Sequence, residues 1–278
     1  MGEVEGYVDS ILEVTSPILP LINMLNKCMI FMESYREEGV KPDVLREKFI
    51  TFLETVREEQ RQCVDKIGKI GSRMIDEGNK VSTFSTSGSV MEILKNAVQK
   101  GKKITAVAFE ARPNAEGYRT LYEISDLGIP VTFGCDALLC KLVPGSAMFF
   151  IGADAISSTG EVYAKTGSYL AALACREFGI PFYVAADTNK FDTMSLLGFP
   201  IKDSHRPADE VTAQKVPDNS RIINISFELI PPSLITGIIT EKGLISPQAV
   251  SLLMEPEKMN DTMVKKLERW KEESEKLN

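Results

Sequence analysis

Hydroxyl side chains are concentrated at the end of the short apolar run 80–84. Residues 83–89 read Thr-Phe-Ser-Thr-Ser-Gly-Ser, follow a predicted strand and open a predicted helix. The hydroxyls of Ser85 and Ser87 and the free backbone N–H groups could hold a phosphate at the positive end of that helix. The segment lacks both the Walker lysine pattern and the G-x-G-x-x-G fingerprint, so helix capping by Ser and Thr is the alternative.

Charged side chains also fall close to the ends of predicted strands. Arg112, Lys165 and Lys190 are three cations that would complete an anion site if the fold brings them together, and each alone reads as a surface charge. Asp154 directly follows the apolar run 147–151, where a poorly solvated carboxylate could act as an acid or a base. A turn or capping role is the alternative for this aspartate.

Composition and charge restrict the classes of protein. The chain has 278 residues, of which 44% are hydrophobic and 26% charged, so it can form one large or two ordinary globular domains. The net charge of −7 disfavours direct binding to nucleic acid. The apolar stretch 17–32 is interrupted by Pro20, Asn23 and Lys27, and the first ten residues are acidic, unlike a signal peptide. We therefore expect a cytoplasmic protein with no membrane partner.

Cysteine and histidine usage argues against a metal centre. The chain has five cysteines, no C-x-x-C pair and one histidine, so we expect neither a metal nor another cofactor. With His205 as the only histidine and no Gly-x-Ser-x-Gly elbow, a Ser-His-Asp hydrolase is also disfavoured.

Two patterns of hydrophobic periodicity divide the chain. Apolar residues from Leu45 to Met74 recur every three or four positions, which predicts one long amphipathic helix. Residues 4–38 also read as helical, with a break near two prolines, so residues 1–77 predict a helical N-terminal domain. Gly78 supplies the stop signal.

Strands and helices alternate in residues 78–278. We expect strands at residues 80–84, 104–109, 131–133, 147–151, 182–186 and 222–225, with helices at 90–99, 118–127 and 167–178. This alternation predicts an α/β fold with a doubly wound, mostly parallel sheet. Ligands of such sheets bind at the carboxyl ends of the strands, which is where the candidate residues fall.

Five segments in fixed order carry a family resemblance. They are FEARPNAEG (109–117), IGADAI (151–156), GEVYAKTGS (160–168), PFYVAADTNKF (181–191) and PPSLITGIITE (231–241). With these motifs the chain, over residues 78 to 250, resembles the family that unites the alpha, beta and delta regulatory subunits of translation initiation factor 2B with ribose-1,5-bisphosphate isomerase and methylthioribose-1-phosphate isomerase.

The resemblance implies a Rossmann-like domain over residues 78–278, a helical domain over 1–77, and a cleft between them that in the isomerases takes a phosphorylated aldose. Those enzymes use a cysteine after the first strand and the aspartate of a Gly-Ala-Asp motif, whose place Asp154 takes here. Ser85 stands at the cysteine position, and a hydroxyl has far too high a pKa to replace a thiol near neutral pH without an activating base. The isomerases' Arg-Gly-Ala segment is not found, and Ala164 replaces the asparagine before Lys165.

These differences favour a regulatory or binding protein that holds a sugar phosphate or nucleotide. By resemblance its partners would be a second copy, in a homodimer or larger assembly, and the alpha subunit of initiation factor 2; we expect the dimer contact in residues 227–239. The alternative is an aldose-phosphate isomerase in which Asp154 does most of the proton transfer and Cys135 stands in for the thiol. A third reading is sugar-phosphate binding without a role in translation.

Overall fold

The computed structural model describes residues 6, 19–37, 40–197, 205–254 and 259–265, which fall into two compact units. The first unit, described over residues 19–37, 40–60 and 259–265, contains α2 (Leu19–Glu37) and the first part of α3 (Pro42–Met74). Its aromatic contacts include Phe31 stacked on Phe52, with ring centroids 4.5 Å apart. The long helix predicted from Leu45 is confirmed and begins three residues earlier, at a proline that suits a first helical turn. The helix predicted over residues 4–18 lies almost entirely outside the described residues.

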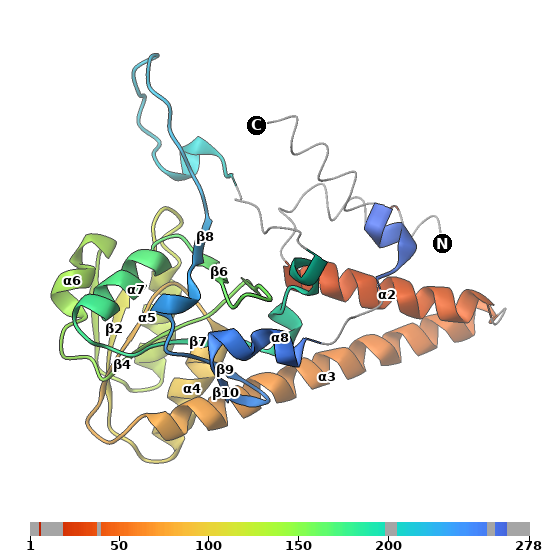
Figure 1. Ribbon diagram of the computed structural model, residues 1–278, viewed down its shortest axis with the longest axis horizontal. Helices are drawn as coiled ribbons and strands as arrows, with labels where there is room; N and C mark the ends of the chain where they lie inside the picture. The colour runs from red at the N-terminus through yellow and green to blue at the C-terminus, as the bar shows by residue number, and fades with distance from the viewer. Residues whose placement is uncertain (1–5, 7–18, 38–39, 198–204, 255–258, 266–278) are drawn as a thin grey trace. The chain divides into compact units, whose positions relative to one another are not determined.

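The second unit, Arg61–Met254, is built on a seven-stranded sheet in the order β10-β9-β7-β4-β1-β2-β3. Figure 1 labels β2, β4, β7, β9 and β10 of this sheet. Its strands are β1 (Lys80–Thr83), β2 (Thr105–Phe109), β3 (Val131–Gly134), β4 (Met148–Ile151), β7 (Phe182–Ala185), β9 (Gly237–Thr240) and β10 (Gly243–Ile245). All neighbouring pairs are parallel except β9 with β10. The expected α/β fold with a mostly parallel sheet is thus confirmed.

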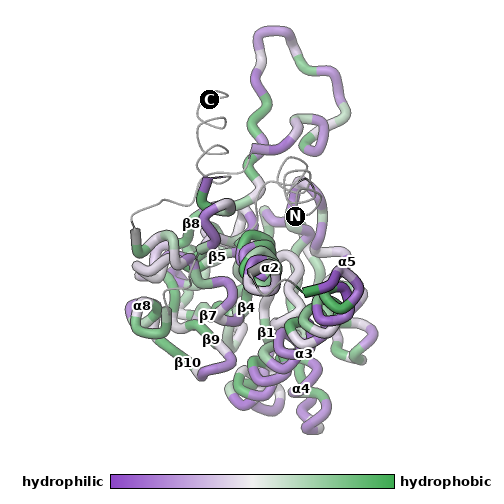
Figure 2. The backbone as a smooth tube through the Cα atoms, turned by 90° about the vertical axis from the view of Figure 1, so that its right-hand side faces the viewer, coloured by the Kyte–Doolittle hydropathy of each residue, from purple (hydrophilic) through white to green (hydrophobic). Residues whose placement is uncertain are grey.

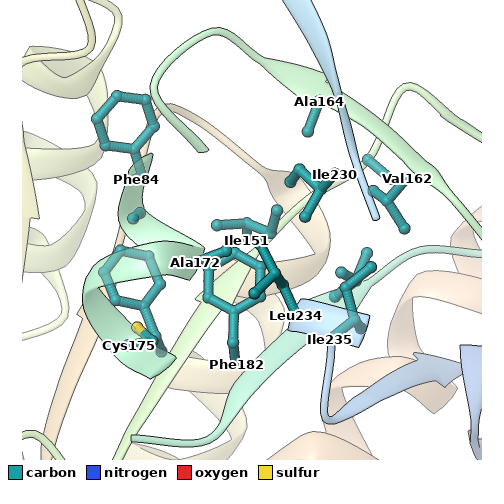
Figure 3. Close-up of a cluster of buried hydrophobic side chains, with 14 of the residues drawn as sticks. Phe84, Ile151, Val162, Ala164, Ala172, Cys175, Phe182, Ile230, Leu234 and Ile235 are labelled. Carbon is teal, nitrogen blue, oxygen red and sulfur yellow. The ribbon is translucent and has the colours of Figure 1, made fainter. Parts of the chain in front are cut away.

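Helices cover both faces of this sheet. They are the end of α3, α4 (Gly88–Gln99), α5 (Gly117–Asp126), α6 (Leu139–Leu142), α7 (Ser168–Glu177) and α8 (Val250–Leu253). Because side chains alternate along a strand, Phe150 of β4 packs in one core cluster with Ile93 of α4, and Phe149 packs in the other with Ala172 of α7. Figure 3 shows the second cluster, to which Phe84, Ala172 and Phe182 all belong.

The tube of α3 and α4 changes repeatedly between hydrophilic and hydrophobic residues, as expected of amphipathic helices that cover a sheet (Figure 2). Gly68 and Gly71 of α3 allow its close approach to α4, since a Cβ at Gly71 would lie 2.5 Å from Ile93. In the described part of the chain, no helix combines the length and apolar character needed to cross a membrane.

A second, three-stranded antiparallel sheet was not predicted. It consists of β5 (Ala155–Ile156), β6 (Val162–Lys165) and β8 (Phe227–Ile230) in the order β5-β6-β8. The strand predicted over residues 222–225 is wrong, because pairing with β6 begins only where Phe227 meets Lys165. Ile223 is instead exposed in a loop, and Ile225 forms only an isolated bridge with His205. The backbone of this stretch finds partners outside a strand: the carbonyl of Asn224 accepts from the backbone N–H of Arg206 at 3.0 Å, and that of Ile225 accepts from the Thr166 hydroxyl at 2.6 Å.

Candidate functional site

The carboxyl ends of the neighbouring strands β1 and β4 lie where the strand order of the sheet reverses. The chain places β2 and β3 on one side of β1 and then returns to place β4 on the other side. Open parallel sheets bind ligands outside the strand ends at such a switch point. Ser85 follows β1 and Asp154 follows β4, so these two candidate residues flank the switch point.

Ser85 is held in an unusual backbone conformation. Its φ is +61°, in the left-handed region that non-glycine residues rarely adopt, and its carbonyl accepts a hydrogen bond from the Thr120 hydroxyl at 2.7 Å. Ala111 and Ala115, in the loop after β2, also have positive φ, at +55° each. Such conformations are costly and persist where the surroundings impose them, often at functional sites.

Glu116 connects the candidate residues, and sequence analysis did not single it out. One of its carboxylate oxygens accepts a hydrogen bond from the Ser85 hydroxyl at 2.9 Å, and the other lies 3.2 Å from the Lys165 ammonium. The Lys165 side chain is only 6% exposed, whereas that of Glu116 is 35% exposed. The sequence signal for Glu116 was its place in the loop after β2, directly before Gly117.

Asp154 lies in the electrostatic field of the same group. Its backbone N–H donates to the carbonyl of Tyr163 at 2.8 Å. Burial raises the pKa of Asp154; Glu116 also raises it, while Lys190 and Lys165 lower it without cancelling the effect of burial. The ammonium of Lys190 donates to the carbonyl of Ala153 at 2.5 Å, next to this aspartate. The structure thus brings Ser85, Asp154, Lys165 and Lys190 together, with Glu116 among them.

Ser87 borders the site through Gly152, which directly follows β4. It caps α4 by accepting a hydrogen bond from the Val90 backbone N–H at 3.4 Å, so the capping geometry expected as an alternative is present. A Cβ at Gly152 would lie 2.6 Å from the Ser87 hydroxyl oxygen. Glycine at position 152 therefore lets the ends of β1 and β4 approach each other.

Arg112 and Cys135 lie apart from this group. Among the described residues, the Arg112 guanidinium donates only to the carbonyls of Pro113 and Val211, and its side chain is exposed. Cys135 is exposed and follows β3, the edge strand that is three strands from β4, or about 14 Å at the usual strand spacing. Another loop carboxylate, Asp136, instead accepts the backbone N–H groups of Ala111 and Arg112 and so fixes the loop that leads to Glu116.

The positive end of α7 already carries a carboxylate. Glu228 of β8 accepts from the backbone N–H groups of Gly167 and Tyr169 at 2.7 and 2.8 Å. In the ranges that the structure describes, no group of three or more His, Cys, Asp or Glu side chains could hold a metal ion. The site itself offers one hydroxyl, two carboxyl groups and two ammonium groups, a set that can bind the hydroxyl and phosphate groups of a ligand and move protons.

Comparison with known sequences gives relatives of two kinds of isomerase. A model of the Initiation factor 2 subunit family matches residues 8–247. Methylthioribose-1-phosphate isomerase of Maridesulfovibrio salexigens is 35% identical over 213 residues, covering 70% of this chain and 61% of that protein. Ribose 1,5-bisphosphate isomerase of Archaeoglobus fulgidus is 29% identical over 254 residues, covering 91% and 79%. The chain therefore spans less than two thirds of the first of these relatives.

Solved structures share the fold. The translation initiation factor eIF-2B of Pyrococcus horikoshii OT3 matches with a TM-score of 0.69 and 27% identity, covering 88% of this chain and 82% of that one. A chain of the tetrameric eIF2B-beta2-delta2 complex from C. thermophilum matches with a TM-score of 0.71, covering 84% and 73%. Its identity of 18% makes that second match a likeness of fold alone.

Proposed function

The chain belongs to the initiation factor 2 subunit family, and from this premise we propose that it is a binding or regulatory member that holds a sugar phosphate or a nucleotide at the carboxyl ends of β1 and β4. In this proposal it is not an isomerase. The relatives include both enzymes and initiation factors, so the choice between the two rests on the residues of this chain.

The observation that carries the proposal is the bonding of Ser85, which stands where the resemblance implies a catalytic cysteine. Its hydroxyl donates to a carboxylate of Glu116, and a carboxylate is far too weak a base to deprotonate an alcohol. Cys135, the cysteine considered as a substitute, is exposed at the far edge of the sheet. Ser85 is therefore suited to donate a hydrogen bond to a ligand and not to transfer a proton.

The remaining polar groups suit a phosphorylated ligand. In the proposal, Lys165 and Lys190 attract its phosphate, while Ser85 and Asp154 contact its hydroxyl groups. Ser87 borders the site, and Arg112 would have to leave its present carbonyl partners to contribute.

The proposed partners follow from the family. Because a matching fold occurs in a tetrameric complex, we propose that this chain forms a homodimer or a larger assembly. From the family resemblance we also propose that it binds the alpha subunit of initiation factor 2 in the cytoplasm.

One observation favours the alternative of an aldose-phosphate isomerase. Burial raises the pKa of Asp154, so this carboxyl group can hold a proton closer to neutral pH and could donate it to a sugar oxygen. An isomerase would still need a second group to take the proton from carbon.

Phosphorus NMR separates the two functions. The protein is incubated with ribose 1,5-bisphosphate, methylthioribose 1-phosphate and other sugar phosphates, and Asp154→Asn serves as the control variant. We expect line broadening of a bound ligand without a product signal. Turnover by the wild type that disappears in Asp154→Asn would instead establish the isomerase, and an unchanged spectrum across the panel would contradict ligand binding.

A further inference from the structure

The ammonium of Lys165 is the most deeply buried cation of the site, and an intramolecular carboxylate already neutralises it. A buried ammonium group needs a hydrogen-bonded counter-charge to offset its lost hydration. In the part of the chain that the structure describes, the only ion pair of Lys165 is with Glu116, at 3.2 Å. The second carboxylate oxygen of Glu116 takes the hydroxyl hydrogen of Ser85. One side chain thus occupies two of the donors that the proposed function assigns to a ligand, the Ser85 hydroxyl and the Lys165 ammonium.

We propose that Glu116 is an internal counter-anion, which a phosphate-bearing ligand has to displace from Lys165 and Ser85 before it can bind there. This inference rests on the proposed function and adds that Glu116 makes the site selective for anionic ligands. A ligand gains access only if it brings an anionic group to replace the carboxylate on Lys165, so a neutral sugar binds weakly.

The charges around Glu116 make displacement necessary. A phosphate that entered beside an unmoved Glu116 would face this carboxylate and also the carboxyl group of Asp154, which lies close enough to be affected by Glu116. Like charges that lie close together repel strongly in a partly desolvated site. The Glu116 side chain is 35% exposed and so already contacts solvent, whereas the Lys165 side chain is only 6% exposed. The carboxylate is therefore the partner that moves.

Glu116→Gln tests this role, because the amide keeps the size and the acceptor oxygen of the side chain but removes its charge. Glu123→Gln is the matched control: it is the same substitution, also in or beside α5, and it breaks the ion pair with Arg119 on the exposed side of the helix. Binding of ribose 1,5-bisphosphate and of inorganic phosphate is measured by titration calorimetry for each protein at one ionic strength.

We expect Glu116→Gln to bind both ligands at least about tenfold more tightly than the wild type, and Glu123→Gln to stay within about twofold of it. The gain should disappear in Glu116→Gln combined with Lys165→Met. Equal or weaker binding by Glu116→Gln would overturn the inference while leaving the proposed binding function intact. Binding by Glu116→Gln alone, with none by the wild type, would support the inference and contradict the proposed function.

Thermal unfolding gives a second readout. Without ligand, Glu116→Gln leaves the Lys165 ammonium buried without its ion-paired carboxylate, so the Tm of this variant should fall below that of the wild type. Inorganic phosphate should then raise the Tm of Glu116→Gln more than that of the wild type. An equal rise of Tm in both proteins would contradict the displacement of Glu116. This criterion also applies if titration calorimetry detects no binding heat for either protein.

Discussion

The Ser85 hydroxyl donates to a Glu116 carboxylate oxygen at 2.9 Å, which ties the end of β1 to the loop that precedes α5. The backbone is in the left-handed conformation at Ser85 itself and at Ala115, directly before Glu116. The position that the resemblance gives to a catalytic thiol therefore faces a negative charge. A thiolate formed at this position would be repelled by it.

Ser85→Cys should consequently yield a thiol of low reactivity. A neighbouring carboxylate raises the pKa of a thiol, and only the thiolate reacts with an alkylating reagent. In Ser85→Cys combined with Glu116→Gln, the carboxylate is gone and the Lys165 cation is left to favour the thiolate. We expect iodoacetamide to label position 85 of the double variant at least about threefold faster at pH 7.5.

The five native cysteines require that labelling be followed peptide by peptide with mass spectrometry. Cys135 and Cys140 are exposed and serve as internal references in the same sample. Equal labelling rates at position 85 in the single and the double variant would show that Glu116 does not control the charge of this position.

Asp154 makes the stability of the chain depend on pH. Its folded-state pKa is raised above the unfolded value near 3.8, chiefly by burial, so the proton is bound more tightly in the folded state. This contribution is fully present below pH 3.8 and is lost as the pH rises through the folded pKa. Asparagine does not ionise, so Asp154→Asn does not lose this stability as the pH rises. We expect its Tm to exceed that of the wild type by about 2 °C at pH 7.

The Tm difference between Asp154→Asn and the wild type should shrink as the pH falls toward 3.8. Asp218→Asn, in an exposed loop, removes the same charge and should leave the pH profile of the wild type unchanged. A Tm of Asp154→Asn below that of the wild type at pH 7 would mean that the attraction of Lys190 and Lys165 outweighs burial.

Gly117 should be intolerant of any side chain. A Cβ at this position would lie 1.6 Å from the backbone carbonyl oxygen of Phe109, a contact that no side-chain rotation relieves. Gly117→Ala should therefore lower the free energy of unfolding by at least about 3 kcal/mol, among the severe effects of point substitutions. Gly88→Ala is the matched control, because nothing lies within 4 Å of its Cβ position. Its effect should stay within about 1 kcal/mol in urea unfolding. Similar midpoints for the two variants would mean that the loop after β2 can rearrange.

Much of the sheet could be predicted because its strands are short apolar runs separated by amphipathic helices. The parallel strands at residues 80–84 and 147–151 are examples, and the structure alters their ends by one residue each. The small antiparallel sheet escaped prediction because β5 has only two residues and β8 lies next to residues 222–225, an isoleucine-rich run of the same length. Pairing with β6 decides which of those two neighbouring stretches becomes a strand, and pairing is not a local property of the sequence.

The candidate site was predictable in its location and only partly in its members. The rule that ligands bind at strand ends pointed to Ser85, Asp154, Lys165 and Lys190, which the fold does bring together. Glu116 lies in one of the loops that this rule indicates but was not singled out, because two alanines of the loop adopt positive φ and nothing in the sequence marks an alanine as left-handed. Arg112 was chosen from the same loop for its charge, yet its hydrogen bonds go to Pro113 and Val211.

The proposed self-association can be tested at β8. This strand pairs only with β6, so its other edge is left without a neighbouring strand in the described part of the fold, and Leu229 on it is 38% exposed. Other apolar residues of the expected contact in residues 227–239, such as Ile238, are buried inside the main sheet and cannot serve. We therefore expect β8 to carry the contact with a second copy.

Sedimentation at micromolar concentration should give a dimer or a larger species for the wild type, and Leu229→Glu should shift it toward monomer. A charge placed in an apolar contact loses hydration without gaining a partner, so the dissociation constant should rise at least about tenfold. Leu252→Glu is the control, because Leu252 of α8 is 83% exposed and lies away from β8 in the sequence. A wild type that is only monomeric would refute self-association. A dimer that persists in Leu229→Glu would place the contact elsewhere, because a contact through β8 would bury the introduced carboxylate without a partner.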